Sequence, residues 1–294
     1  EVIIHNRMKQ MGYRYWRCFE TAGARLQWVG TEDQGTVEDM ERAITENTAA
    51  LHYLGRAPAR GGVPSVEDVI ALGRKHSIPV IVDAAGETWP VDGLSKFAKA
   101  GADLVAYAAK YFNAPHSTGI LCGKKELIDI AFKHTFVGFQ YGTLGIGRGY
   151  KIERHEIVAV VEALKEWLSM NHEERLMAED NMVATITAAV KDIPGVSVTP
   201  GTRAMTGVGE PLSETGGPAG SMMISIDPQA VGKTAAEVAE VLRDGNPSIF
   251  AGVRRAELAA GTESMGGQDV LGFTMICMDE GQEQIVAERL KAAL

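Results

Sequence analysis

Short apolar runs alternate with amphipathic segments through the first half of the chain. The run IPVIVDAAG (78–86) is rich in β-branched residues, which is typical of a strand buried on both faces, and DLVAYAA (103–109) is a second such run. Before them, Ser65 opens SVEDVIALGRKHS, where apolar residues recur at helical spacing between an acidic first turn and a basic last turn. This alternation predicts an α/β fold with a mainly parallel sheet and right-handed crossovers.

The same patterns predict the other elements. Residues 153–191 form a long amphipathic stretch, interrupted at most near 169–172, which is typical of a helix that bridges two lobes. We therefore expect a large domain over 1–155, and a bridging helix with a small α+β domain over 156–294. Further helices are expected at 36–47, 95–102, 124–133, 234–245 and 283–294, the first of them with Thr36 as N-cap. Strands are expected at 1–5, 48–55, 118–123, 193–200, 220–228, 246–255 and 269–279. A flexible loop is expected at 201–220.

Composition narrows the class of protein. The 294 residues are 45% apolar and 23% charged, and the formal net charge is −9, so no basic surface for nucleic acid or an anionic membrane is expected. Cys18, Cys122 and Cys277 lie far apart without zinc-ligand spacing, which favours a reduced compartment and no metal site. No apolar run approaches the roughly 20 residues of a membrane helix, and no signal peptide is evident. We expect a cytoplasmic protein whose full gene product has a segment before Glu1, since the chain begins without Met inside a strand pattern.

Two ionisable residues stand where apolar strands end. Asp83 closes IPVIVD and Lys110 follows DLVAYAA, one strand–helix–strand crossover later, so both are expected on one rim of the sheet. A carboxylate and an amine on one rim suit pyridoxal 5'-phosphate (PLP), because the carboxylate keeps the pyridine nitrogen protonated while the amine forms the Schiff base. The apolar strand end favours the neutral amine. In the alternative interpretation, Asp83 caps the next helix and Lys110 extends into water.

The residues around this pair resemble a known family. VIVDAAGE and KAGADLVAYAAKYFNAPHSTGILCGKKELI are similar to the selenocysteine synthase (L-seryl-tRNA selenium transferase) superfamily of fold-type I PLP-dependent enzymes, most closely to its D-glucosaminate-6-phosphate ammonia-lyase-like branch. The family pattern K-x-x-x-x-P-x-x-x-G-x-x-x-G-[RK]-K is matched by Lys110, Pro115, Gly119, Gly123, Lys124 and Lys125. The resemblance extends more weakly over almost the whole chain.

This resemblance implies roles for individual residues. Lys110 would form the Schiff base, and the expected cofactor contacts are Lys110, Asp83, His52, Ala85 and His116. Arg148, Lys151 and Arg254 are expected to bind an anionic substrate, with Arg255 a further candidate; solvated surface positions are the alternative for these residues. Many relatives carry a Ser-Gly pair directly before the lysine, where this chain has Ala108 and Ala109, so a hydroxyl that would hold the cofactor phosphate is absent.

The implied function is that of a PLP-dependent lyase. It would eliminate water and ammonia from a small hydroxylated amino acid or amino-sugar acid and release a 2-keto acid. The sequence leaves two alternatives open: a selenium or sulfur transferase acting on seryl-tRNA, and a non-catalytic homologue that has lost the cofactor. The resemblance also implies a homodimer or larger homo-oligomer, with a small-molecule substrate and without nucleic-acid or membrane partners.

Overall fold

The chain divides into two compact units. The computed structural model describes residues 1–10, 14–56, 61–143, 145–201, 220–254 and 269–294. Unit 1 covers Glu1–Met170 and unit 2 covers Asn171–Leu294. The division falls later than the expected boundary at 155/156, at the point where the long amphipathic stretch is interrupted. The expected loop at 201–220 lies almost wholly outside the described residues.

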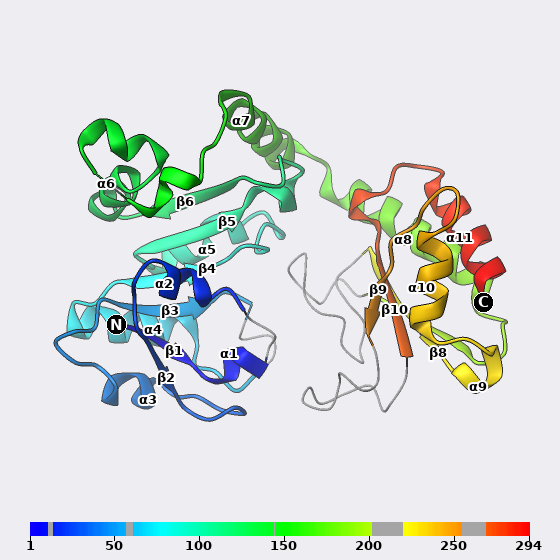
Figure 1. The fold of residues 1–294 in the computed structure, drawn as a ribbon, viewed down its shortest axis with the longest axis horizontal. Coiled ribbons are helices and arrows are strands. Elements are labelled where there is room, and N and C mark those ends of the chain that lie inside the picture. The colour runs from blue at the N-terminus through cyan, green and yellow to red at the C-terminus, as the bar shows by residue number, and fades with distance from the viewer. Residues whose placement is uncertain (11–13, 57–60, 144, 202–219, 255–268) are drawn as a thin grey trace. The chain divides into compact units, whose positions relative to one another are not determined.

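Unit 1 is built on a six-stranded sheet in the order β2-β1-β3-β4-β5-β6 (Figure 1). The first five strands in this order are parallel, and β6 pairs antiparallel with β5. The sheet is therefore mainly parallel, as the strand and helix pattern predicts. Its strands are β1 (Val2–His5), β2 (Leu26–Val29), β3 (Ala50–Leu54), β4 (Val80–Asp83), β5 (Leu104–Ala108) and β6 (Gly119–Gly123).

The helices of unit 1 begin where the sequence supplies capping residues. Thr36 and Asp39 form a capping box at the start of α3, and Ser65 accepts a hydrogen bond from the Asp68 amide at the start of α4. The expected helix 36–47 is shorter in the structure, because α3 ends at Arg42. The helices are α1 (Arg7–Gln10), α2 (Arg17–Thr21), α3 (Val37–Arg42), α4 (Val66–His76), α5 (Gly93–Ala100), α6 (Lys125–Lys133) and α7 (Arg154–Ser169), with 3-10 turns η2 (Ala109–Phe112), η3 (Phe136–Tyr141) and η4 (Ile146–Gly149).

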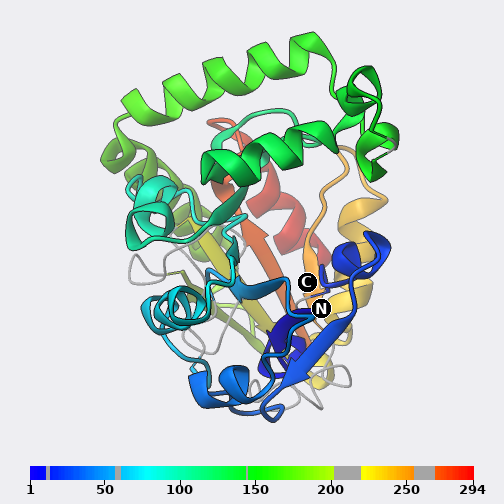
Figure 2. The same cartoon turned by 90° about the vertical axis from the view of Figure 1, so that its left-hand side faces the viewer.

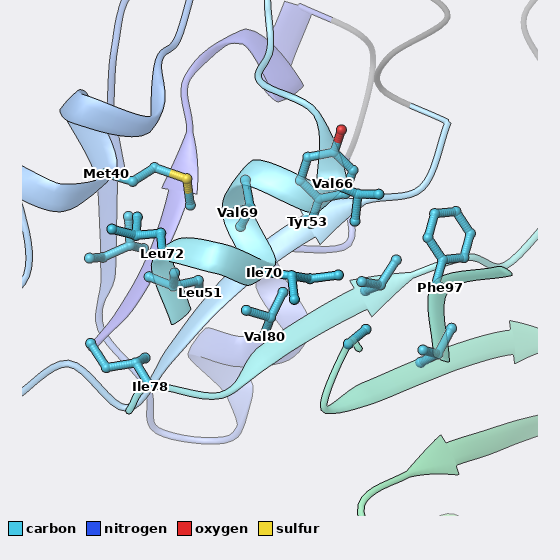
Figure 3. Packing of buried hydrophobic residues seen from close by; sticks show 14 of the residues in the cluster. Met40, Leu51, Tyr53, Val66, Val69, Ile70, Leu72, Ile78, Val80 and Phe97 are labelled. Carbon is cyan, nitrogen blue, oxygen red and sulfur yellow. The ribbon is translucent and has the colours of Figure 1, made fainter. Parts of the chain in front are cut away.

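One face of the sheet carries the main core of unit 1. Leu51, Tyr53 and Val80 point from the strands toward Val69 and Ile70 of α4 and are all buried (Figure 3). On the opposite face, side-chain burial varies from strand to strand. Every residue of β3 is buried, whereas Ile81 and Asp83 of β4 are partly exposed. The expectation that 78–86 and 103–109 are buried on both faces is therefore wrong in this structure, because β4 and β5 both alternate buried and half-exposed residues.

Helix α7 belongs to unit 1 because its end is anchored there. Trp167 is 1% exposed, and its indole Nε1 donates a 2.9 Å hydrogen bond to the Thr88 carbonyl. Figure 2 shows α7 from the side as a long green helix. The bridging stretch is thus two helices, α7 and α8 (His172–Val190), and the first of them contacts η2 of unit 1.

Unit 2 has the expected α+β character. Its four-stranded sheet has the order β7-β8-β10-β9 and is antiparallel throughout. A second core joins the sheet to α8, α10 and α11, and includes Met222, Ile224 and Leu271. The elements are β7 (Val196–Pro200), β8 (Ser221–Ile226), α9 (Pro228–Val231), α10 (Ala235–Arg243), β9 (Gly252–Arg254), β10 (Asp269–Thr274), η6 (Met275–Cys277) and α11 (Gln282–Ala293).

The contact between Gly35 and His5 gives a prediction about stability. A Cβ atom at position 35 would lie 1.8 Å from Nδ1 of His5, whose side chain is fully buried. We expect Gly35→Ala to lower the free energy of unfolding in urea by about 1–3 kcal/mol, because the ring cannot move without displacing its neighbours. Gly149→Ala is the matched control, since no atom of the residues that the structure describes lies within 4 Å of its Cβ position. Equal stabilities of the two variants would show that the His5 pocket yields easily.

Candidate active site

The ends of β4 and β5 lie side by side at the carboxyl edge of the parallel sheet. Asp83 pairs with Ala106 in the ladder, and the Ala108 amide donates a 3.1 Å hydrogen bond to the Ala85 carbonyl. Lys110 follows in η2, two residues after β5 ends. Asp83 and Lys110 therefore leave neighbouring parallel strands at the same rim, which is where ligands bind in open α/β sheets.

The carboxylate of Asp83 is oriented by its own turn. Its Oδ1 accepts a 3.1 Å hydrogen bond from the Ala85 amide, and its backbone carbonyl accepts one of 2.8 Å from Gly55. The alternative role of capping the next helix is not seen, because the N-cap of α5 is Asp92. The backbone of Ala85 therefore makes two hydrogen bonds at this rim: its amide donates to the Asp83 carboxylate, and its carbonyl accepts from Ala108 at the end of β5.

Lys110 stands on a turn whose backbone is closed on itself. The Asn113 amide donates to the Lys110 carbonyl at 3.3 Å, and the Ala114 amide donates to the Ala109 carbonyl at 3.2 Å. Asn113 ends the turn with φ of 64°, a left-handed conformation that asparagine tolerates well. The side chain of Lys110 is half-buried, and its Nζ lies 5.1 Å from the centroid of the Tyr111 ring. The backbone is thereby fixed while the amine remains accessible at the rim.

The two alanines before the lysine do not offer their amides to a phosphate. The Ala108 amide is engaged by Ala85, and the Ala109 amide donates to the Thr118 carbonyl at 3.0 Å. Neither residue has a hydroxyl. A phosphate group at this rim must therefore be held by residues other than this pair.

His52 lies inside the sheet and not at its rim. It is 1% exposed, and its ring is in edge contact with that of Phe19, with a centroid distance of 4.9 Å. It falls two residues before the end of β3, opposite Ile81, so Leu54 and not His52 is level with Asp83. Burial lowers the pKa of His52 to about 4, which keeps the imidazole neutral near pH 7. The expected position of His52 beside the cofactor at the strand end differs from this placement.

The other candidate residues are spread around the structure. His116 is exposed in the loop before β6, and the adjacent Ser117 donates a 2.6 Å hydrogen bond to Glu156 of α7. Arg148 and Lys151 are exposed, and the Arg148 guanidinium lies 5.7 Å from the centroid of the Phe139 ring. Arg254 ends β9 in unit 2, with a side chain outside the described part of the structure, and Arg255 lies outside the described residues altogether.

A hollow of about 640 Å³ lies elsewhere in unit 1. It is bounded by α3, α4 and the loops at 34–36 and 62–64, and its lining includes Glu38, Asp68 and Lys75. Neither Asp83 nor Lys110 contributes to it. The chemistry of Lys110 is not assigned to this hollow, because the carboxylate that would act together with its amine, Asp83, lies at the rim where β4 and β5 end.

A second buried histidine, His5, ends β1 at the carboxyl edge of the sheet. It is completely buried, and neither ring nitrogen has a hydrogen-bond partner among the residues described. Burial lowers its pKa from 6.5 to about 4, and the nearby carboxylate of Asp39 raises it only partly. The folded protein therefore favours the neutral ring, whereas the unfolded chain takes up a proton below about pH 6.5.

This pKa difference predicts a loss of stability in mild acid. The stabilisation from neutral His5 is complete above pH 6.5 and declines as the pH falls toward 4. Between about pH 7 and about pH 5, we expect the free energy of unfolding of the parent to fall by about 2 kcal/mol more than that of His5→Leu. Urea titrations at both pH values measure this, with His155→Gln, at an exposed position, as the control. Parallel pH dependences of the parent and His5→Leu would contradict the assignment.

The arrangement at the rim fits PLP in its two reactive groups. A carboxylate and an amine stand at the ends of adjacent strands, each with its backbone satisfied independently of a ligand. Among the described residues, no group of three or more His, Cys, Asp or Glu is placed to hold a metal ion. Within the same described ranges, no helix is long and apolar enough to span a membrane.

Comparisons with curated proteins extend the observed similarity. The chain is 33% identical over 232 residues to a 5'-C-glycyluridine monooxygenase-decarboxylase of a Streptomyces species, covering 78% of this chain and 52% of that protein. It is 27% identical over 292 residues to the D-glucosaminate-6-phosphate ammonia lyase of Salmonella typhimurium, covering 99% of this chain and 69% of that enzyme. An L-seryl-tRNA(Sec) selenium transferase of Aquifex aeolicus is 27% identical over 224 residues, covering 67% of this chain and 47% of that protein. The chain thus spans about half the length of the first of these relatives.

Solved structures and the family comparison agree on the fold. A structure of D-glucosaminate-6-phosphate ammonia-lyase superposes with a TM-score of 0.70 at 24% identity, covering 100% of this chain and 70% of that one. A structure of SPT with PLP superposes with a TM-score of 0.54 at 14% identity, covering 99% of this chain and 66% of that one. The expected resemblance and the fold-type I architecture are confirmed. Because residues 3–204 match the aminotransferase class-V family, the chain belongs to that family of PLP-dependent enzymes.

Proposed function

We propose that the protein is a PLP-dependent lyase that removes the β-hydroxyl and the amino group of a small hydroxylated amino acid or amino-sugar acid, giving a 2-keto acid and ammonia. The observation that carries the proposal is the placement of Asp83 and Lys110 at the ends of the adjacent strands β4 and β5. The similarity to an ammonia lyase over 99% of the chain supports this reaction class.

In this proposal two residues hold the cofactor. Lys110 would hold it through Nζ, and the carboxylate of Asp83 would hold its pyridine nitrogen. When bound, PLP supplies an electron sink for the carbanion formed at the substrate α-carbon. The hydrogen bond from the Ala85 amide to Oδ1 of Asp83 orients the carboxylate, and with it the second carboxylate oxygen. Ala85, through its backbone, and His116 remain proposed cofactor contacts, whereas His52 does not, because it is 1% exposed and its ring contacts that of Phe19.

Lys110 also has a proposed role in proton transfer. The Nζ of Lys110 would be the base that takes the α-proton of the substrate. The proposed substrate contacts are Arg148, Lys151 and Arg254, because guanidinium and ammonium groups bind carboxylate or phosphate by charge-assisted hydrogen bonds. Arg148 and Lys151 are exposed and so are accessible to an anionic ligand.

A product assay tests the proposal. The full-length protein, incubated with PLP, is offered a panel of hydroxy amino acids and amino-sugar acids, and 2-keto acid and ammonia are quantified together. We expect equal amounts of the two products from at least one substrate, without oxygen uptake. Absence of both products across the panel, from protein that has bound PLP, would reject the lyase assignment.

The relative with 33% identity suggests a second candidate function. Its name describes a monooxygenase-decarboxylase of 5'-C-glycyluridine, that is, an enzyme acting on an amino acid joined to a nucleoside. The two reactions differ in their balance: elimination needs no oxidant and conserves the carboxyl group, whereas oxidative decarboxylation consumes oxygen and releases carbon dioxide. Measuring oxygen uptake and carbon dioxide with the same substrate panel, extended to glycyl nucleosides, separates them.

The proposed assembly is a cytoplasmic homodimer or larger homo-oligomer without a nucleic-acid partner. Large apolar side chains that are at least half exposed in unit 1 support self-association, and the net charge of −9 argues against binding tRNA. Sedimentation and a tRNA mobility-shift assay test these two points. These exposed apolar side chains include Ile130, Phe132, Phe139, Tyr141 and Ile157.

A further inference from the structure

A buried threonine contacts the residue that follows Lys110. Thr88 lies after β4 and is completely buried, and its hydroxyl donates a 3.2 Å hydrogen bond to the carbonyl of Tyr111. If the 3-10 turn continued, the Ala114 amide would donate to the Tyr111 carbonyl. It donates instead to the Ala109 carbonyl. Thr88 therefore satisfies a backbone acceptor in the lysine turn that the turn leaves open.

A tryptophan from a distant part of the chain holds this threonine. The Trp167 indole donates a 2.9 Å hydrogen bond to the Thr88 carbonyl, across 79 positions of sequence. Both side chains are at most 1% exposed, so neither hydrogen bond competes directly with bulk water. A continuous path of hydrogen bonds thus runs from the end of α7, through Thr88, to the backbone beside Lys110.

The same helix holds the lysine loop at a second point. Ser117, between η2 and β6, donates a 2.6 Å hydrogen bond to Glu156 in the first turn of α7. This bond lowers the pKa of Glu156, consistent with an ionised acceptor. The segment carrying Lys110 is therefore tied at the Thr88 side by buried groups and at the Ser117 side by an exposed one.

We propose that Thr88 and Trp167 are positioning residues for Lys110. They fix the Tyr111 carbonyl, and with it the backbone from which the ε-amine reaches the rim beside Asp83. The inference rests on the proposed function in one respect, that Lys110 is the amine that attaches PLP. Small displacements of a reacting group are costly, so loss of this anchor lowers the efficiency of attachment without removing any group that contacts the cofactor.

The test compares Thr88→Val, Thr88→Ser and Trp167→Phe with the parent, all as full-length protein. Each is titrated with PLP, reduced with borohydride and digested, and the fraction of pyridoxyl label on Lys110 is measured by peptide mass spectrometry. We expect Thr88→Val and Trp167→Phe to need about fivefold more PLP for half-maximal labelling of Lys110, the factor that corresponds to one net hydrogen bond. Thr88→Ser, which keeps the hydroxyl, is expected to restore the parent value.

Tyr53→Phe is the matched control for a general loss of stability. The Tyr53 hydroxyl also donates to a backbone carbonyl, that of Pro64, at 2.8 Å, and its ring is buried on the α4 face of the sheet. It should leave labelling of Lys110 unchanged. Equal labelling in Thr88→Val and the parent, or an equal loss in Tyr53→Phe and Thr88→Val, would overturn the positioning role.

A second readout separates this inference from the proposed function. Hydrogen exchange of the amides at 109–114, measured without PLP, should quicken in Thr88→Val and Trp167→Phe but not in Thr88→Ser or Tyr53→Phe. A parent that is never labelled on Lys110 refutes the proposed function, and the exchange data then still decide whether the anchor exists. Unchanged exchange in all variants rejects the anchor whatever the labelling shows.

Discussion

Lys110→Ala will lose the visible absorption that the full-length parent acquires with PLP, and its kcat/KM will fall by about 10²–10⁴-fold. This range is the usual contribution of a positioned acid–base group, and in this protein the same amine also attaches the cofactor. The fold should survive, because the backbone of η2 is held by Ala109, Asn113 and Thr88 and not by the lysine side chain. Absorption spectra, steady-state kinetics and urea unfolding on one preparation measure all three properties.

Lys124→Ala is the matched control for Lys110→Ala. Lys124 lies nearby in sequence, matches the same family pattern and forms an ion pair with Asp103 at 2.5 Å. It is expected to keep the visible band that borohydride abolishes. A band that persists in Lys110→Ala and vanishes in Lys124→Ala would move the attachment site away from η2.

Asp83→Asn is expected to lower kcat/KM by about 10- to 100-fold, as is common when a hydrogen bond between charged groups is lost. The substitution isolates the charge, because the asparagine oxygen can still accept the hydrogen bond from the Ala85 amide that shapes the turn. The reaction depends on a protonated pyridine ring, which the neutral amide no longer favours. The expected signature is a large fall in kcat with the covalent attachment to Lys110 retained.

Asp92→Asn is the control for this charge change. Asp92 is exposed ahead of α5 and makes no side-chain cap hydrogen bond there. Its variant should match the parent in kcat and KM. If Asp83→Asn behaves in the same way, the carboxylate at the end of β4 has no part in the chemistry.

The rim could be predicted from sequence because it depends on local patterns. Apolar β-branched runs ending in Asp83 and shortly before Lys110 predict buried strands, and the helix predicted between them favours a parallel pair. The structure pairs these strands directly. Capping residues such as Thr36 and Ser65 gave the starts of helices, whereas the end of α3 was missed because no glycine or proline marks it.

Long-range contacts explain what the sequence did not reveal. Thr88 and Trp167 are 79 positions apart, and neither belongs to a motif, so their hydrogen bond is visible only once α7 is folded onto the lysine turn. The burial of His52 also depends on contacts that the sequence does not show. The pattern of β3 reveals neither that the strand ends at Leu54 nor that Phe19 covers the His52 ring. The sequence pattern predicts no helix or strand within residues 6–35, although β2 lies there and pairs with β1.

A crystal structure of the full-length protein with PLP tests the central claim most directly. The account predicts a covalent bond from Nζ of Lys110 to the cofactor aldehyde carbon, and a pyridine nitrogen within about 2.7–3.2 Å of an Asp83 carboxylate oxygen. A cofactor bound to another lysine, or with its ring nitrogen out of reach of Asp83, would contradict the claim that these two strand ends form one site.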